Sequence, residues 1–189
     1  MATKTKFDPK NMDTLLSAER RSRLDAQRVI SALPIMAHHR VADIGCGPGY
    51  FTIPLAKYLF DGKAYALDIR TEMLDATRQS LEAVHLTNVD LMQSKEKKLP
   101  LEDASLDGAL LSFVLQEAND PGALLKETLR CLRKSGWLAI LEWHKRETDG
   151  GPPLEQRIDE EEMGALTAKV GFRMAAWRTL NDSQYMVLL

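Results

Sequence analysis

The chain has 189 residues, of which 44% are hydrophobic and 28% charged, and its formal net charge is −2 at pH 7. This composition is typical of one globular domain, and the charge gives no general attraction to nucleic acid or to anionic membranes. Its two cysteines, Cys46 and Cys131, cannot form a disulfide framework, and the absence of a C-x-x-C pair gives no indication of a metal site.

The N-terminal segment begins MATKTKFDPKN, which is polar and lacks the apolar core of a signal peptide. No segment approaches the roughly 18 apolar residues of a membrane span, so we expect a cytoplasmic protein. Apolar residues spaced over 12–33 predict one or two amphipathic helices around the basic stretch ERRSR. Its arginines, Arg20, Arg21 and Arg23, either lie on a solvated helix face, which we favour, or contact an anionic substrate.

From Arg40 onward, short apolar runs alternate with helical patterns. Strands separated by helices of ten or more residues predict parallel βαβ units and a doubly wound α/β sandwich. We expect Thr71 to cap the second of these helices and Pro121 to begin the third. The predicted strands are RVADIG from residue 40, then 64–69, 88–93, 106–114 and 136–143, and the predicted helices are 50–59, 71–84 and 121–132.

The C-terminal part departs from this alternation. After the loop ETDGGPP and a predicted helix near 159–169, the apolar runs GFRMAAW and SQYMVLL are only a few residues apart. A parallel crossover needs about a dozen residues, so these runs can form only an antiparallel hairpin. The sheet is therefore expected to end in a β-hairpin.

The turn DIGCGPG joins the first strand to the first of the alternating helices. Its glycines allow a sharp turn with exposed backbone, and the helix beyond offers free N–H groups to an anion. However, the spacing Gly45-x-Gly47-x-Gly49 differs from the dinucleotide fingerprint G-x-G-x-x-G, and Pro48 has no N–H. The turn is therefore a poor pyrophosphate site and a better one for a carboxylate or a ribose.

Asp68 ends the second predicted strand, 19 positions after Gly49. A carboxylate at this place sits beside the first turn and can accept hydrogen bonds from ribose hydroxyls. The alternative is a helix N-cap for TEML. The glycine turn upstream favours the ribose role, which indicates an adenosine cofactor without saying which one.

Four motifs in order, VADIGCGPGYFTIPLA, ALDI, LPLEDASLDGAL and the stretch ending LRKSGWLAILEW, resemble the class I methyltransferases that depend on S-adenosylmethionine (SAM). The likeness is strongest to the small ubiquinone/menaquinone-biosynthesis type, also called methyltransferase type 11. It covers residues 40–143 by motif and 171–189 by the hairpin. The resemblance implies a Rossmann-like, seven-stranded sheet, mostly parallel with an antiparallel C-terminal hairpin and helices on both faces. It also implies SAM as cofactor and a single domain over 1–189, with 1–35 covering the substrate side.

The resemblance also implies residue roles. Asp43 would bind or organise the methionine amino group of SAM, and Ile69 would pack on the adenine. Family members commonly have an aspartate after the third strand for the adenine amino group, but here that position is Lys95, and Glu96 is the possible substitute. The implied cofactor-binding set is Asp43, Gly45, Cys46, Gly47, Gly49, Asp68, Ile69, Glu96, Ser112 and Phe113.

The sequence assigns no catalytic base, but it offers two candidates. Ligands sit at the carboxyl ends of parallel strands, and of the four histidines only His144 falls at that edge. Glu117, in SFVLQEAND after the fourth strand, is the other candidate. Gln116, Glu142 and Trp143 are candidates for the substrate wall.

The sequence therefore predicts methyl transfer from SAM to a small-molecule acceptor, with no nucleic-acid or membrane partner and no metal. Two alternatives remain open: a SAM-binding or partner-binding protein without catalysis, and an NAD(P)-linked oxidoreductase, which the glycine spacing disfavours. The acceptor and the oligomeric state are not indicated.

Overall fold

The structure is a computed structural model that describes residues 6–189, so residues 1–5 of the predicted N-terminal segment lie outside the described residues. Seven strands form one sheet in the order β3-β2-β1-β4-β5-β7-β6. The strands are β1 (Arg40–Ile44), β2 (Lys63–Asp68), β3 (Val89–Gln93), β4 (Leu106–Ser112), β5 (Leu132–Trp143), β6 (Ala176–Thr179) and β7 (Gln184–Leu188). The α-helices are α1 (Met12–Leu15), α2 (Ala18–Arg23), α3 (Ala26–Ser31), α4 (Thr52–Tyr58), α5 (Thr71–Ala83), α6 (Pro121–Cys131) and α7 (Glu160–Val170), with short 3-10 turns at Pro9–Asn11 and Leu154–Gln156.

Strands β1 to β5 are parallel to one another, whereas β7 is antiparallel to both β5 and β6. This arrangement confirms the predicted doubly wound α/β sheet and its C-terminal hairpin. The strand order reverses between β1 and β4, which is where ligands bind in open α/β sheets.

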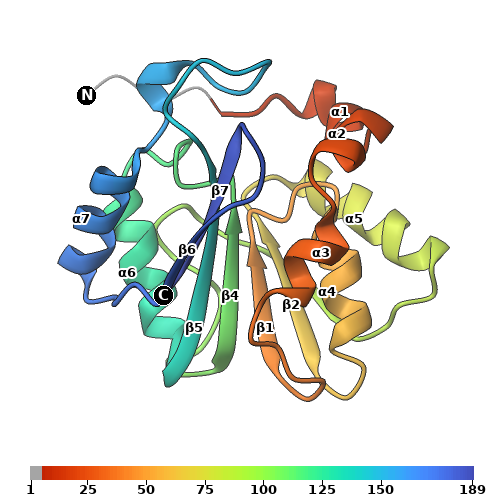
Figure 1. Cartoon of the computed structure of the whole chain (residues 1–189). Coiled ribbons are helices and arrows are strands. Elements are labelled where there is room, and N and C mark those ends of the chain that lie inside the picture. The colour runs from red at the N-terminus through yellow and green to blue at the C-terminus, as the bar shows by residue number, and fades with distance from the viewer. Residues whose placement is uncertain (1–5) are drawn as a thin grey trace.

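Helices cover both faces of the sheet (Figure 1). Alternating side chains of β4 show why: Ala109 and Leu111 belong to the core under α6 and α7, while Leu110 belongs to the core under α3 and α4. All three side chains are fully buried, as expected for a strand covered on both sides. Helix α5 packs beside α4, over β2 and β3.

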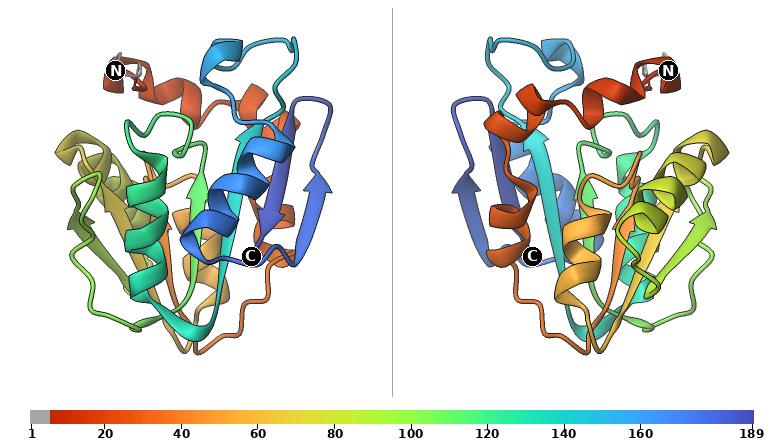
Figure 2. Two further views of the ribbon diagram at one scale, coloured as in Figure 1. Left: turned by 90° about the vertical axis from the view of Figure 1, so that its left-hand side faces the viewer. Right: turned by 90° about the vertical axis from the view of Figure 1, so that its right-hand side faces the viewer.

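The N-terminal segment folds as three short helices rather than the predicted one or two. The physical reason is capping: the hydroxyl of Ser17 accepts a hydrogen bond from the N–H of Arg20, and the carboxylate of Asp25 accepts from Gln27 and Arg28. Each cap starts a new helix direction. Only α3 has buried residues, while α1 and α2 have none and lie across the carboxyl edge of the sheet (Figures 1 and 2).

Several helices and strands begin or end at residues other than those predicted. Thr71 is the first residue of α5 and not its cap; the cap position is Arg70, whose side chain makes no capping bond. Strand β4 ends at Ser112 because Phe113 has a φ of 63°, outside the extended region. Strand β5 begins at Leu132, four residues early, and a register shift against β4 absorbs the extra residues.

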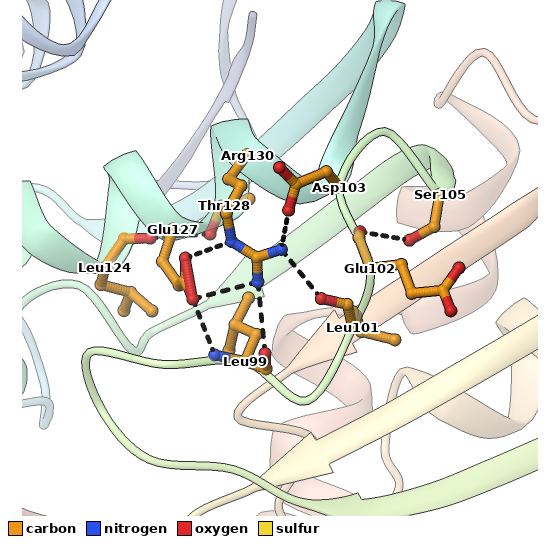
Figure 3. A network of polar contacts seen from close by, with 9 residues as sticks. All are labelled: Leu99, Leu101, Glu102, Asp103, Ser105, Leu124, Glu127, Thr128 and Arg130. Atoms are coloured by element: carbon orange, nitrogen blue, oxygen red, sulfur yellow. Dashed lines mark hydrogen bonds and ion pairs between the residues drawn. The ribbon is translucent and has the colours of Figure 1, made fainter.

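Arg130 fastens the loop between β3 and β4 to α6 (Figure 3). Its guanidinium donates to the backbone oxygens of Leu99 (3.3 Å) and Leu101 (2.9 Å) and pairs with Asp103 (2.5 Å). Glu127, one turn earlier in α6, receives two further hydrogen bonds from Arg130 and one from the N–H of Leu99. Because Leu99 also lines the cavity described below, this network helps to shape it.

Within residues 6–189, no helix is both long and apolar enough to cross a membrane.

Candidate active site

A cavity of about 650 Å³ lies at the carboxyl edge of β1, β2 and β4, beneath α1 and α2. This volume is within the usual range for a small-molecule site. Ten of the twelve predicted cofactor-binding and catalytic residues line it: Asp43, Gly45, Cys46, Gly47, Asp68, Ile69, Glu96, Ser112, Phe113 and Glu117. Gly49 and His144 do not.

The glycine turn uses its three glycines for different purposes. All three have a positive φ: 74° at Gly45, 55° at Gly47 and 91° at Gly49. A Cβ at Gly45 would lie 2.4 Å from Cγ2 of Val114, and one at Gly49 would lie 3.2 Å from Cγ2 of Thr77. A Cβ at Gly47 would meet only Leu15, at 3.6 Å. Gly45 and Gly49 therefore permit close packing of protein on protein, while Gly47 presents backbone to the cavity.

Helix α5 supports the turn from behind. The hydroxyl of Thr77 donates to the backbone oxygen of Gly47 at 2.7 Å and lies 3.9 Å from Sγ of Cys46. Burial raises the pKa of the Cys46 thiol well above its ordinary value, so this thiol stays protonated. Cys46 thus packs its side chain under the turn, and sequence reasoning missed the supporting role of Thr77.

Asp68 connects the ends of β1 and β2. Its Oδ2 accepts from the N–H of Gly47 and its Oδ1 from the N–H of Arg70, both at 3.0 Å. The residue is 8% exposed and faces the cavity, and burial raises its pKa. Next to it, Ile69 lines the same cavity and is 36% exposed. A carboxylate beside an open apolar surface suits a ribose hydroxyl beside an adenine ring.

Asp43 is the most buried acid of the site, at 1% exposure. The hydroxyl of Thr52 donates to its Oδ2 at 2.6 Å. Burial raises the pKa of Asp43 to about 6, because a charge removed from water is disfavoured. This carboxylate can therefore gain from a cationic ligand group.

Glu96 forms hydrogen bonds with other residues of the protein. Its carboxylate receives hydrogen bonds from Lys6 Nζ (2.7 Å), from the N–H and side-chain amide of Asn119 and from the N–H of Asp120. Burial acts to raise its pKa, but these bonds, first that from Lys6, leave it lowered. The residue joins the N-terminal segment to the loop before α6. Lys95 forms a tight turn with Lys98 through two backbone hydrogen bonds.

The end of β4 presents one polar and one aromatic side chain. The hydroxyl of Ser112 is buried and has no hydrogen-bond partner among the described residues. Phe113 holds its ring 5.9 Å from that of Trp143, and its strained backbone is fixed by a hydrogen bond from its N–H to the oxygen of Leu141. An orphaned hydroxyl at a cavity wall is what a polar ligand group would satisfy.

The two catalytic candidates are placed differently. Glu117 lines the cavity, accepts from the N–H of Phe7 at 3.0 Å and has its pKa raised by burial. His144 packs its ring 5.3 Å from that of Tyr185, its buried Nε2 has no hydrogen-bond partner within residues 6–189, and burial lowers its pKa. Only Glu117 is therefore placed to exchange a proton with a ligand.

The three predicted wall residues do not all reach the cavity. Gln116 and Trp143 line the cavity, and the buried side-chain Oε1 of Gln116 has no hydrogen-bond partner in the part of the chain that the structure describes. Glu142 is fully buried away from the cavity, where it accepts from the N–H of Gln116 at 3.1 Å. Glu142 thus positions the loop after β4 and does not form the wall.

Two arginines near the cavity make contacts that the sequence did not indicate; of the two, Arg20 lines the cavity and Arg157 does not. Arg157, 5% exposed, donates to backbone oxygens of the loop that follows β5, including those of Pro152 (2.9 Å) and Gly150 (3.0 Å). Arg20 lies with its Cζ 4.6 Å from the centre of the Tyr50 ring and lines the cavity, so the solvated face predicted for it is wrong. Burial lowers the pKa of Arg20. Among residues 6–189, no group of three or more acidic, histidine or cysteine side chains could hold a metal ion.

Comparison with known proteins places this site in a family. The family model described as "Methyltransferase domain" matches residues 42–140. A solved structure of a SAM-dependent methyltransferase from Aquifex aeolicus is 30% identical, with a TM-score of 0.92 over 97% of this chain and 98% of that one. The chain therefore belongs to the class I SAM-dependent methyltransferases, and the alternative of an NAD(P)-linked oxidoreductase is not supported.

Among the curated relatives is a demethylmenaquinone methyltransferase from Bacillus mycoides (strain KBAB4), 31% identical over 134 residues. The match covers 69% of this chain and only 55% of that protein. The [4+2]-cyclase SpnF is 23% identical with a TM-score of 0.71 over 80% of this chain and 58% of that one, a likeness that shows the fold alone. A shared fold does not by itself decide the reaction.

The residues present fit SAM, the cofactor of this family. Asp68 and Ile69 face the cavity beside each other, and Gly47 leaves room where a Cβ would stand. The orphaned hydroxyl of Ser112 and the buried carboxylate of Asp43 lie at the adjoining strand ends.

Proposed function

We propose that this protein, as a single domain over residues 1–189, transfers a methyl group from SAM to a small-molecule acceptor in the cavity beneath α1 and α2. The observation that carries the proposal is the pairing of Asp68 with the backbone of Gly47. It sets one carboxylate beside one open glycine at the strand ends, a place for one ribose and no pyrophosphate.

Different residues of the cavity are then proposed to bind different groups of the cofactor. Asp68 accepts hydrogen bonds from ribose hydroxyls, and Ile69 offers its exposed apolar surface to the adenine. Asp43 balances the charge of the methionine amino group. When bound, SAM supplies an electrophilic methyl group on a positively charged sulfur. Lys95 and Glu96 are engaged with protein groups, so adenine selectivity is assigned to backbone atoms near Ser94, which also lines the cavity.

The acceptor is proposed to lie in the same cavity, next to the methyl group of the cofactor. Phe7, Phe113 and Trp143 line the cavity and favour an acceptor with an apolar ring or chain. The match to a demethylmenaquinone methyltransferase, over part of that protein, supports a small acceptor of this kind. Enclosure by these side chains excludes water and aligns acceptor and donor, which contributes several kcal/mol to such reactions.

Glu117 is proposed as the base where the acceptor keeps its proton at neutral pH. Its carboxylate lines the cavity, and burial raises its pKa toward the range in which a general base works well. An acceptor that is already ionised needs no base.

A panel of acceptors with SAM labelled in the methyl group tests the proposal. It would contain phenols, quinols, amines and thiols, with product identified by mass spectrometry. We expect label in one chemical class. Bound S-adenosylhomocysteine together with silence across the panel would support a SAM-binding protein without catalysis and count against methyl transfer.

A further inference from the structure

Helix α2 places a cation at one end of the cavity. The guanidinium of Arg20 lies over the ring of Tyr50, with its Cζ 4.6 Å from the ring centre, and 5.7 Å from that of Phe113. The hydroxyl of Tyr50 donates to the backbone oxygen of Leu24, which fixes the ring under α2. This stacked arrangement orients the plane of the guanidinium in a way that a flexible surface arginine lacks.

The guanidinium keeps unused hydrogen-bonding capacity. The hydrogen bond that the structure gives it runs from Nη1 to the oxygen of Leu15, at the long distance of 3.4 Å. A guanidinium carries five N–H donors, so most of those of Arg20 remain for a ligand in the cavity. A planar fork of donors is suited to a carboxylate.

The neighbouring arginines do not share these contacts. Arg23 also lines the cavity, but it pairs with Glu19 at 2.8 Å and donates to the oxygen of Asp149, with half of its side chain exposed. Arg21 is exposed and does not line the cavity. Arg20 is therefore distinguished among the three by its contacts and not merely by its charge.

An opposite charge lies nearby. The carboxylate of Asp43 lines the same cavity, is almost completely buried and attracts Arg20 electrostatically. Within residues 6–189 the two side chains form no direct ion pair, so a ligand can contact both. A buried acid and an oriented cation facing one space match a zwitterion, with its ammonium toward Asp43 and its carboxylate toward Arg20.

We propose that Arg20 binds the α-carboxylate of the methionine part of the cofactor and, with Asp43, forms a clamp for the amino-acid zwitterion. This inference rests on the proposed function, because it assumes that SAM occupies the cavity. It adds a binding residue from outside the sheet.

The test compares S-adenosylhomocysteine with 5′-methylthioadenosine, which keeps the adenosine and sulfur but lacks the amino-acid carboxylate. Affinities are measured by calorimetry for the wild type, Arg20→Met, Arg20→Lys and the matched control Arg21→Met. We expect Arg20→Met to weaken S-adenosylhomocysteine by about 10- to 100-fold, the usual size for a charge-assisted hydrogen bond. The affinity of Arg20→Met for methylthioadenosine should change by less than about twofold. The affinity of Arg20→Lys for S-adenosylhomocysteine should lie between those of the wild type and Arg20→Met, and the affinities of Arg21→Met should match those of the wild type.

A second measurement needs no variant: the wild type should prefer S-adenosylhomocysteine over its decarboxylated analogue by a similar factor. Equal weakening of both nucleosides in Arg20→Met, or no weakening of either, would overturn the clamp, as would the absence of this preference. If Arg20→Met lost affinity for an anionic acceptor but not for S-adenosylhomocysteine, Arg20 would belong to the acceptor site, and this result would also overturn the clamp. A wild type that binds neither nucleoside would contradict the proposed function itself, so the two failures are distinguishable.

Discussion

The carboxylate of Asp68 accepts a hydrogen bond from the backbone N–H of Gly47, with 3.0 Å between Oδ2 and N. The bond joins the residue that ends β2 to the middle of the turn that follows β1. It places an acceptor and an open stretch of backbone side by side at the edge where the parallel strands end.

Replacing Asp68 should therefore affect both binding and stability. We expect Asp68→Ala to weaken the binding of S-adenosylhomocysteine by about 1–3 kcal/mol, because the ribose hydroxyls lose their hydrogen-bond acceptor. The substitution should also lower the free energy of unfolding, because the N–H groups of Gly47 and Arg70 lose their acceptor. Calorimetry and urea unfolding measure the two effects. Asp90→Ala removes a carboxylate of the same sheet that pairs with Lys63 outside the cavity and should leave the affinity unchanged. Unchanged affinity in Asp68→Ala would reject the ribose assignment.

Burial of Asp43 predicts a pH dependence of stability. Its pKa is about 6 in the folded protein, against an ordinary 3.8. Because the carboxyl pKa is raised on folding, its contribution to the free energy of unfolding is fully present below pH 4, where Asp43 is protonated in both the folded and the unfolded chain. The contribution is lost as the pH rises through 6, because Asp43 ionises more readily in the unfolded chain. Two pKa units correspond to about 3 kcal/mol.

The variant Asp43→Asn lacks this titration and keeps an acceptor for Thr52. We expect its free energy of unfolding, relative to the wild type, to increase by about 2–3 kcal/mol between pH 4 and pH 7. Urea unfolding at several pH values measures this difference. A difference that is constant with pH would show that Asp43 titrates normally.

The two catalytic candidates can be separated by paired substitutions. Glu117→Gln should slow transfer to a protonated acceptor by about 100-fold or more, as for loss of a general base, while S-adenosylhomocysteine affinity stays within about twofold. His144→Gln should leave both quantities unchanged, since its ring lies against Tyr185 and away from the cavity. Steady-state rates with the acceptor found in the panel provide the measurement. The reverse pattern, with His144 sensitive and Glu117 not, would contradict this placement.

The Arg130 network predicts a stability effect. Arg130→Met removes the hydrogen bonds to Leu99 and Leu101 and the ion pair with Glu127, so we expect a loss of about 1–3 kcal/mol in the free energy of unfolding. Arg133→Met, which removes a more exposed pair with Asp107, should cost less than about 1 kcal/mol. Chemical unfolding of both variants decides the matter. Similar losses would show that the network adds nothing beyond a surface ion pair.

Local patterns explain why much of the fold was predictable. The alternation of strands and helices and the closing hairpin follow from periodicity and connection length, which a short stretch of sequence contains. The glycine turn and Asp68 were predictable for the same reason, because their spacing is local.

The parts that were missed depend on contacts between distant segments. The sequence favours a solvated Arg20, whereas the fold places α2 beside Tyr50 and Phe113. The sequence offers Glu96 for the adenine amino group, whereas in the fold its carboxylate binds Lys6 and Asn119. Topology brought His144 to the correct edge, but the direction of its side chain is decided by packing against Tyr185.

The central claim is that the cavity binds an adenosine with one ribose and an amino-acid zwitterion, and calorimetric titration of S-adenosylhomocysteine against NAD⁺ tests it most directly. The account predicts that S-adenosylhomocysteine saturates one site per chain and that NAD⁺ neither binds there nor competes. Binding of NAD⁺ without binding of S-adenosylhomocysteine, or binding of neither, would contradict it.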